Sequence, residues 1–139
     1  MSAATETQPD ATTAVAGLIR FLETGEVGEG LFAPDMFSDV NLPTWWLQAE
    51  TADRLVGIRQ HAHPFRGSVE VRRVDPTDRG FVIEFEERWE DGGERWYARE
   101  LIRADVVGAT ITEMAIYCTG DWDDQRQSDH AAAVTLLRP

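Results

Sequence analysis

Glu87 and Glu100 are the residues whose types and spacing best suit acid–base chemistry. They lie on two alternating runs, 81–90 and 95–104, that flank Gly92-Gly93. A two-residue Gly-Gly loop between such runs predicts a β-hairpin. One face of this hairpin then carries the pairs Trp89–Trp96, Glu87–Ala98, Phe85–Glu100, Ile83–Ile102 and Phe81–Ala104. A slip of one residue would move this apolar set to the other face, so the pattern selects this register.

The two glutamates are diagonal neighbours on this face, at a spacing of about 7–8 Å that long side chains can bridge. Poor solvation among apolar neighbours and mutual repulsion both raise the pKa of a carboxyl group, so one of the two is expected to stay protonated near neutral pH. A protonated carboxyl that donates to a developing oxyanion, beside a second group acting as base, is a known catalytic arrangement. The structural alternative is that Glu87, near the hairpin tip, reaches water.

Further candidate bases are an aspartate and a histidine. Asp39 and Asn41 alternate on a predicted extended segment, 39–46. An amide is no base, so Asp39 would serve, unless it caps a turn instead. His61 and His63 lie at the end of a predicted helix, where positions two apart point about 200° apart, so we expect no metal site. We expect one of them, preferably His61, to line a pocket as a general base; the alternative is a favourable interaction with the helix C-terminus.

The residues expected to hold a ligand are mostly apolar or aromatic. An aromatic wall is predicted from Phe85, Trp89, Trp96 and Trp45. Further lining is predicted from Asn41, Ile102, Met114, Ile116 and Cys118. Nothing in the sequence supplies a base or positive charge beside Cys118, so this thiol is expected to act as a small buried hydrophobe.

The composition excludes several classes of function. The 139 residues include 25 acidic and 13 basic residues, for a formal net charge of −12. This charge argues against nucleic acid and anionic membranes as partners. All basic residues are arginine, so Schiff-base chemistry and a phosphate-binding loop with lysine are excluded. The single cysteine rules out an internal disulfide and a cysteine-rich zinc site. We expect no metal and no cofactor.

Helices and strands alternate along the chain in a way that predicts one α+β domain over residues 14–139. Apolar residues at 15, 18, 19 and 22 predict a first helix, which ends before Gly25. A second, shorter helix is predicted over 29–36 and a third over 52–63, with Thr51 as its cap. Strands are predicted over 68–74, 81–90, 95–104 and 110–118, followed by a final helix that is capped by Asp121 or Asp123 and ends near Val134.

Residues 1–13 differ from the rest of the chain in composition. They read MSAATETQPDATT, with neither a basic start nor an apolar stretch, so we expect a flexible tail rather than a signal peptide. No apolar run approaches the roughly 18–20 residues of a membrane span. We therefore expect a cytoplasmic protein.

The segment Leu101-Ile-Arg-Ala-Asp-Val-Val-Gly-Ala-Thr-Ile-Thr-Glu-Met-Ala-Ile-Tyr117 resembles the penultimate strand, glycine turn and last strand of the nuclear transport factor 2-like (NTF2-like) superfamily. Asp39-Val-Asn-Leu-Pro43 resembles its first strand. This superfamily includes ketosteroid isomerases, limonene epoxide hydrolases and SnoaL-like polyketide cyclases. The resemblance implies three N-terminal helices packed on a strongly curved antiparallel sheet, a cone or half-barrel around an apolar pocket, here with an added C-terminal helix. It also implies a homodimer that pairs through the outer face of the sheet.

The resemblance implies roles for some residues and argues against others. Glu100 matches, within one residue, the strand position of the oxyanion-binding aspartate of ketosteroid isomerases, and Asn41 lies near their general base. The Asp–Arg–Asp constellation of the epoxide hydrolases falls on apolar residues, namely Phe85, Ile83 and Ile116. The oxyanion tyrosine of the isomerases falls near Leu18, which is also apolar.

We therefore expect a small-molecule enzyme of SnoaL-like type that performs cyclisation, isomerisation or dehydration. Its substrate would be apolar, polycyclic or aromatic, with a carbonyl group. Glu100 would be proton donor or oxyanion stabiliser, Glu87 or Asp39 its partner, and His61 a reserve base. The alternative is a non-catalytic ligand-binding or dimeric interaction module, because one fold hosts many functions.

Overall fold

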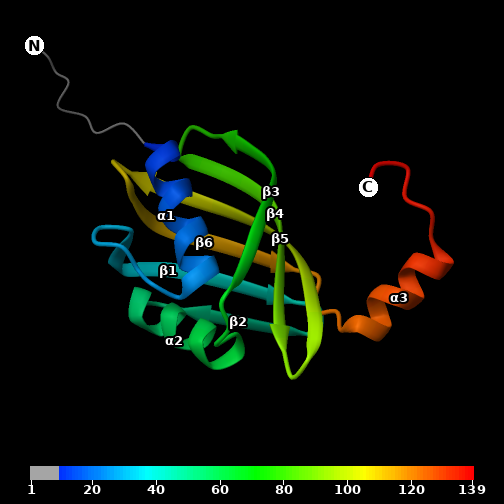
Figure 1. The fold of residues 1–139 in the computed structure, drawn as a ribbon. Coiled ribbons are helices and arrows are strands. Elements are labelled where there is room, and N and C mark those ends of the chain that lie inside the picture. Colours follow the sequence, from blue (N-terminus) through cyan, green and yellow to red (C-terminus); the bar gives the residue numbers. More distant parts are fainter. Residues whose placement is uncertain (1–9) are drawn as a thin grey trace, which may run out of the picture.

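The computed structural model describes residues 10–139 as a curved sheet with helices in its hollow (Figure 1). In chain order the elements are α1 (Ala11–Thr24), β1 (Phe32–Leu42), β2 (Trp45–Ala49), α2 (Ala52–Ala62), β3 (Gly67–Pro76), β4 (Gly80–Asp91), β5 (Glu94–Val107), β6 (Thr110–Cys118) and α3 (Asp124–Ala133). Within this range, no helix is both long and apolar enough to cross a membrane.

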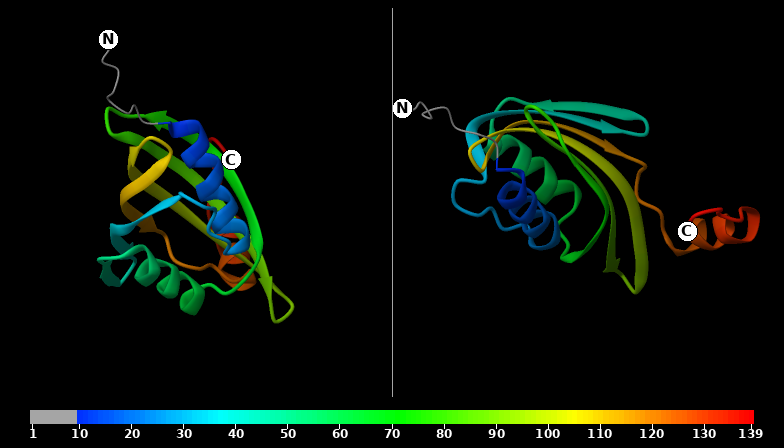
Figure 2. Two further views of the ribbon diagram at one scale, coloured as in Figure 1. Left: turned by 90° about the vertical axis from the view of Figure 1, so that its left-hand side faces the viewer. Right: turned by 90° about the horizontal axis from the view of Figure 1, so that it is seen from above.

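The six strands form one sheet in the order β2-β1-β6-β5-β4-β3. Every neighbouring pair is antiparallel except β1 and β6, which are parallel. The expectation of a purely antiparallel sheet is therefore wrong at this one junction. The reason is topological: the first strand and the last strand meet in the middle of the sheet, and the chain between them adds strands at both edges. Helices α1 and α2 lie on the concave side, whereas α3 extends away from the sheet (Figure 2).

The expected helix over 29–36 is wrong, because residues 32–36 belong to β1. Phe32 and Met36 are buried while Pro34 is exposed. Pro34 lies where the pairing of β1 with β6 shifts register, between Phe32 and Phe37. A proline cannot donate to the ladder and is tolerated at such an irregularity. Two N-terminal helices, rather than three, thus pack on the sheet.

The other helices begin at the expected kinds of residue. Thr51 caps α2 by accepting a hydrogen bond from the Arg54 N–H, and Asp123, rather than Asp121, caps α3. Of the expected tail 1–13, residues 1–9 lie outside the described residues. The remainder corrects that boundary: Asp10 is the N-cap of α1, its carboxylate accepting from the Thr13 N–H at 3.1 Å, and the helix begins at Ala11.

The predicted register of the β4–β5 hairpin is confirmed at every pair, from Phe81 with Ala104 to Trp89 with Trp96. Gly92 and Gly93 form the turn with positive φ angles of 61° and 82°. This conformation, which suits the twist of a hairpin, favours glycine at both positions. The concave face of the hairpin therefore carries Glu87 and Glu100 toward the helices.

A continuous core fills the space between the helices and the concave face. Its largest fully buried side chains include Phe81, Phe85, Leu18 and Met36. In contrast, α3 has no buried residue. It is joined to the sheet by a bridge in which the backbones of Tyr97 and Trp122 exchange two hydrogen bonds.

Candidate functional site

A cavity of about 160 Å³ lies between the two N-terminal helices and the concave face of the sheet. Most of its lining is aliphatic, with one phenyl ring from Phe21. The apolar residues are Leu18, Phe21, Leu22, Val40, Leu42, Leu55, Ile58, Ala62, Ile102, Met114 and Ile116, together with the Cys118 thiol. The five remaining lining residues are ionisable: Arg59, His63, Glu87, Glu100 and Asp121.

Arg59 of α2 and Glu87 of β4 form a buried, two-pronged ion pair. The Arg59 Nη2–Glu87 Oε1 distance is 2.6 Å and the Nη1–Oε2 distance is 3.1 Å. Arg59 Nη2 also donates to the Leu22 carbonyl oxygen at 2.9 Å, which ties the guanidinium to α1. Burial would raise the pKa of Glu87, but hydrogen bonds with Glu100 and Arg59 outweigh it, and its pKa lies below the usual value. Glu87 is therefore ionised.

Glu100 of β5 has the opposite protonation behaviour. Its side chain is buried, with the residue only 9% exposed. Burial, a hydrogen bond with Glu87 and the charge of Glu87 together raise the pKa of Glu100 well above the usual value. No N–H or O–H donor among the described residues reaches the buried Glu100 Oε2, so the ionised form would be unsatisfied. The protonated form can instead donate its own hydrogen to Glu87.

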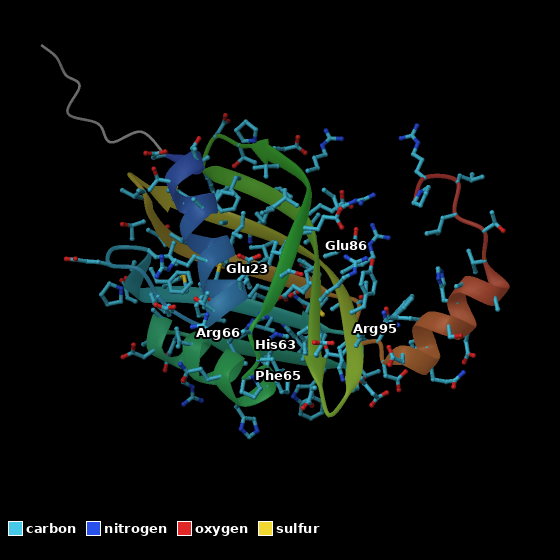
Figure 3. All side chains as sticks on the ribbon, in the orientation of Figure 1. Glu23, His63, Phe65, Arg66, Glu86 and Arg95 are labelled. Atoms are coloured by element: carbon cyan, nitrogen blue, oxygen red, sulfur yellow. The ribbon has the colours of Figure 1, made fainter. Side chains whose placement is uncertain are left out.

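His63 ends α2 and lies between the cavity and the hairpin. Its ring packs edge-on against Trp89, with centroids 4.3 Å apart, and against Phe65 at 5.5 Å. Figure 3 shows His63 beside Phe65, where the chain leaves α2. Burial, and then the positive charge of Arg59, lower the pKa of His63 to about 4. The imidazole is therefore neutral at physiological pH.

Asp121 follows β6 and reaches the same cavity from its open end, because this lining residue is also exposed to solvent. Partial burial and the neighbouring charge of Glu87 raise the pKa of Asp121 above its usual value. No hydrogen bond or ion pair joins its carboxylate to a described residue.

On the last strand, burial raises the pKa of the Cys118 thiol to about 12, so this sulfur is not a nucleophile.

The structure corrects the expected positions of Asp39 and Asn41. Ser38 and Val40 are buried on the concave side of β1, so Asp39 and Asn41 project from the outer face. The Asp39 carboxylate accepts hydrogen bonds there from Asn41 Nδ2 at 3.0 Å, Trp46 Nε1 at 2.7 Å and Gln48 Nε2 at 2.9 Å. Neither Asp39 nor Asn41 lines the cavity.

The preferred histidine and the aromatic wall are also corrected. His61 is exposed, and His63 takes the position expected for it. Trp45 is 66% exposed and lies outside the cavity lining. Phe85 is buried in the core without reaching the cavity, and Trp89 and Trp96 stack on each other at 6.4 Å beyond it. Ile102, Met114, Ile116 and Cys118 do line the cavity, together with Glu87 and Glu100.

Arg59 and Asp121 are ionisable lining residues that were not predicted from the sequence. The signal for Arg59 was present: Leu55, Ile58, Arg59 and Ala62 have the i, i+3, i+4, i+7 spacing of one helix face, and an arginine on an apolar face needs a buried partner. Asp121 carried no such signal beyond its place at the end of a strand. Within residues 10–139, no group of three or more histidine, cysteine, aspartate or glutamate side chains could hold a metal ion.

The chain was compared with protein families, curated proteins and solved structures. No family model and no curated protein matches. Among solved structures, an NTF2-like protein from Anabaena variabilis aligns with a TM-score of 0.66 and 16% identity over 87% of this chain and 96% of its own.

The descriptions of two further structures name an activity or a bound molecule. An LEH-like epoxide hydrolase from M. tuberculosis aligns with a TM-score of 0.62 and 14% identity, over 79% of this chain and 85% of its own. A protein with a ketosteroid isomerase-like fold from Catenulispora acidiphila, solved in complex with trimethylamine, aligns with a TM-score of 0.59 and 14% identity, over 81% of this chain and 88% of its own. These likenesses, together with the curved sheet and its two enclosed helices, show that the chain has the NTF2-like, ketosteroid isomerase-like fold.

Proposed function

We propose that this chain is a small-molecule enzyme of SnoaL-like type that performs acid–base chemistry without a cofactor on an apolar carbonyl compound. One observation carries the proposal: Glu100 lies buried in the wall of an apolar cavity beside the Glu87–Arg59 ion pair, and this setting raises its pKa so that the acid stays protonated. A carboxylic acid kept neutral at pH 7 can stabilise a developing oxyanion by donating a hydrogen bond.

The proposed reaction begins with removal of a proton from the carbon next to the carbonyl group. His63 is the base, since its neutral imidazole accepts the proton. With a pKa of about 4, its basicity matches that of an ordinary carboxylate. The electron pair of the C–H bond moves to the carbonyl oxygen, which takes a hydrogen bond or the proton from Glu100. Return of the proton from His63 to another carbon completes an isomerisation. In a dehydration, the C–O bond of a neighbouring hydroxyl group breaks instead, and the leaving hydroxide takes the proton from His63 and departs as water.

Of the expected polycyclic or aromatic substrates, the size of the cavity does not favour the polycyclic ones. Its volume of about 160 Å³ is close to the roughly 150 Å³ of an engineered protein cavity that binds benzene. The aliphatic walls therefore suit a single ring with short substituents, with its carbonyl oxygen at Glu100. On related folds, one neighbour is described as an epoxide hydrolase and another was solved with trimethylamine, which supports small-molecule ligands.

Exchange of α-protons provides a test that needs no knowledge of the natural substrate. Purified protein would be incubated with cyclohexanone in D2O, and deuterium incorporation followed by NMR. We expect exchange above the buffer rate, and a fall of about 100-fold or more in Glu100→Gln. The matched control is Glu90→Gln, an exposed glutamate on the same hairpin, which should exchange like wild type. Unchanged exchange in both Glu100→Gln and Glu100→Leu would remove Glu100 from the mechanism.

A second candidate function, an interaction module, is supported by the outer face of the sheet. Leu101 and Tyr117 are paired neighbours there, 39% and 51% exposed, and Phe37 and Trp46 add further exposed apolar surface. We propose that this face pairs two copies of the chain. Sedimentation equilibrium should then give a dimer for wild type and a monomer for Leu101→Glu, which buries a charge at the interface. A monomeric wild type at micromolar concentration contradicts this proposal.

A further inference from the structure

The charges of the cavity do not balance. Among the described residues that line it, Arg59 is the single cation, and Glu87 already matches its charge at 2.6 Å. His63 is neutral. The Asp121 carboxylate thus leaves one negative charge at the open end of an apolar cavity, without a partner among residues 10–139. A ligand with a negative charge would be repelled from this site, and a neutral one would leave the charge unpaired.

A second, independent feature of the same cavity lacks a partner. Glu100 is nine-tenths buried, and its Oε2 atom has no N–H or O–H donor among the described residues. A buried acceptor without a donor is uncommon in folded proteins and often marks a place where a missing group binds. Glu100 and Asp121 line the same cavity, and the charge of Asp121 raises the pKa of Glu100, so we expect one donor group in the cavity to serve both.

We propose that the cavity binds an apolar molecule that carries a protonated amine at one end. The ammonium group donates hydrogen bonds to Asp121 and to Glu100 Oε2, and the apolar body packs against residues such as Leu18, Ile102 and Met114. This inference goes beyond the proposed function: an amine with an apolar ring would occupy the cavity in place of a carbonyl substrate, because its ammonium group takes the position beside Glu100. The binding itself requires no turnover.

Binding should release a proton. Arg59, Glu87 and Asp121 are the charged groups that act on Glu100, and the negative charges of Glu87 and Asp121 favour its protonated form, whereas the neighbouring Cys118 thiol is neutral. An ammonium ion beside Glu100 adds a second positive charge, which favours the carboxylate. Glu100 then loses its O–H proton to solvent, keeps the electron pair of that bond, and pairs with the ammonium. The amine itself stays protonated throughout.

The effect of charge can be tested with three ligands that share one apolar ring and differ in the charge of its substituent: cyclohexylamine, cyclohexanol and cyclohexanecarboxylate. Isothermal titration calorimetry at neutral pH should show the amine binding at least about tenfold more tightly than the alcohol, a difference of about 1.4 kcal/mol, with no binding of the carboxylate. Asp121→Asn should remove the preference for the amine. Asp123→Asn is the matched control, because it is two residues away, lies outside the lining, and asparagine also caps a helix.

Repeating the titration in two buffers of different ionisation enthalpy counts the protons released. We expect release with cyclohexylamine in wild type and Asp123→Asn, and none in Glu100→Gln. Equal affinity for amine and alcohol in wild type overturns the inference, even if cyclohexanone exchange shows that the cavity is catalytic. Absence of binding by the amine at millimolar concentration overturns it as well. Amine-selective binding without ketone exchange supports the inference and contradicts the proposed function instead.

Discussion

Replacing Arg59 by methionine should destabilise the protein strongly, because it leaves a buried carboxylate without its partner. The Arg59 and Glu87 side chains are 16% and 5% exposed, so water cannot replace the lost guanidinium. The substitution removes two hydrogen bonds to Glu87 and one to the Leu22 carbonyl. Breaking a buried ion pair in this way typically costs about 3–5 kcal/mol. Glu87 can reduce the cost by taking up a proton, so we expect a loss of about 3 kcal/mol at pH 7.

Urea unfolding at pH 7, followed by tryptophan fluorescence, measures this loss. Arg54→Met is the control, since Arg54 is an exposed residue of the same helix and should change stability by less than about 0.5 kcal/mol. Adding Glu87→Gln to Arg59→Met should restore at least about 1 kcal/mol, because the buried charge is gone. If Arg59→Met is as harmless as Arg54→Met, or if the second substitution adds a further loss, the buried pair does not hold the site together.

Three further predictions concern Glu100, His63 and Gly80. Folding raises the pKa of Glu100 above its ordinary value of 4.5, so the free energy of unfolding of wild type should fall as pH rises above that value. Glu100→Gln lacks this titration, so its free energy of unfolding relative to wild type should rise by up to about 1.4 kcal/mol per pH unit in urea unfolding. The His63 pKa is lowered from 6.5 to about 4, which corresponds to at most about 3 kcal/mol. Because the ring is only partly buried and solvent screens its charge, wild type should lose about 2 kcal/mol as pH falls through this range, and His63→Phe should not. A Cβ at Gly80 would clash with the Ala104 carbonyl oxygen, so Gly80→Ala should reduce the free energy of unfolding by about 2 kcal/mol and lower the thermal midpoint. Gly57→Ala is the control: this helix position is open, so the substitution should raise the midpoint.

Local patterns in the sequence were enough to predict the β4–β5 hairpin with its register. Alternation of period two and the Gly92-Gly93 turn are properties of neighbouring residues, and they place Glu87 and Glu100 on one face without reference to the rest of the chain. The helix caps at Thr51 and Asp123 were predictable for the same reason, since a cap acts within three residues.

The segment 29–36 shows where local patterns are ambiguous. A short apolar run that contains a proline fits either a helix end or a strand. Its conformation is decided by pairing with β6: Phe32 pairs with Ile111, and the Ile111 N–H donates to the Leu31 carbonyl at 2.7 Å. These partners lie about 80 residues away in the chain, so no window of neighbouring residues reports on them.

The sequence by itself determined which residue types were available: two inward-facing glutamates, no lysine, and no second cysteine to form a disulfide. Only the tertiary structure decided how the acids are charged. The Arg59 side chain reaches Glu87 across 28 residues of sequence, and Asp121 reaches the same cavity from the segment that follows β6. A carboxyl group's protonation depends on the burial and charges within a few ångströms, and that surrounding is assembled from α2, β4, β5 and the end of β6 only when the helices pack into the curved sheet.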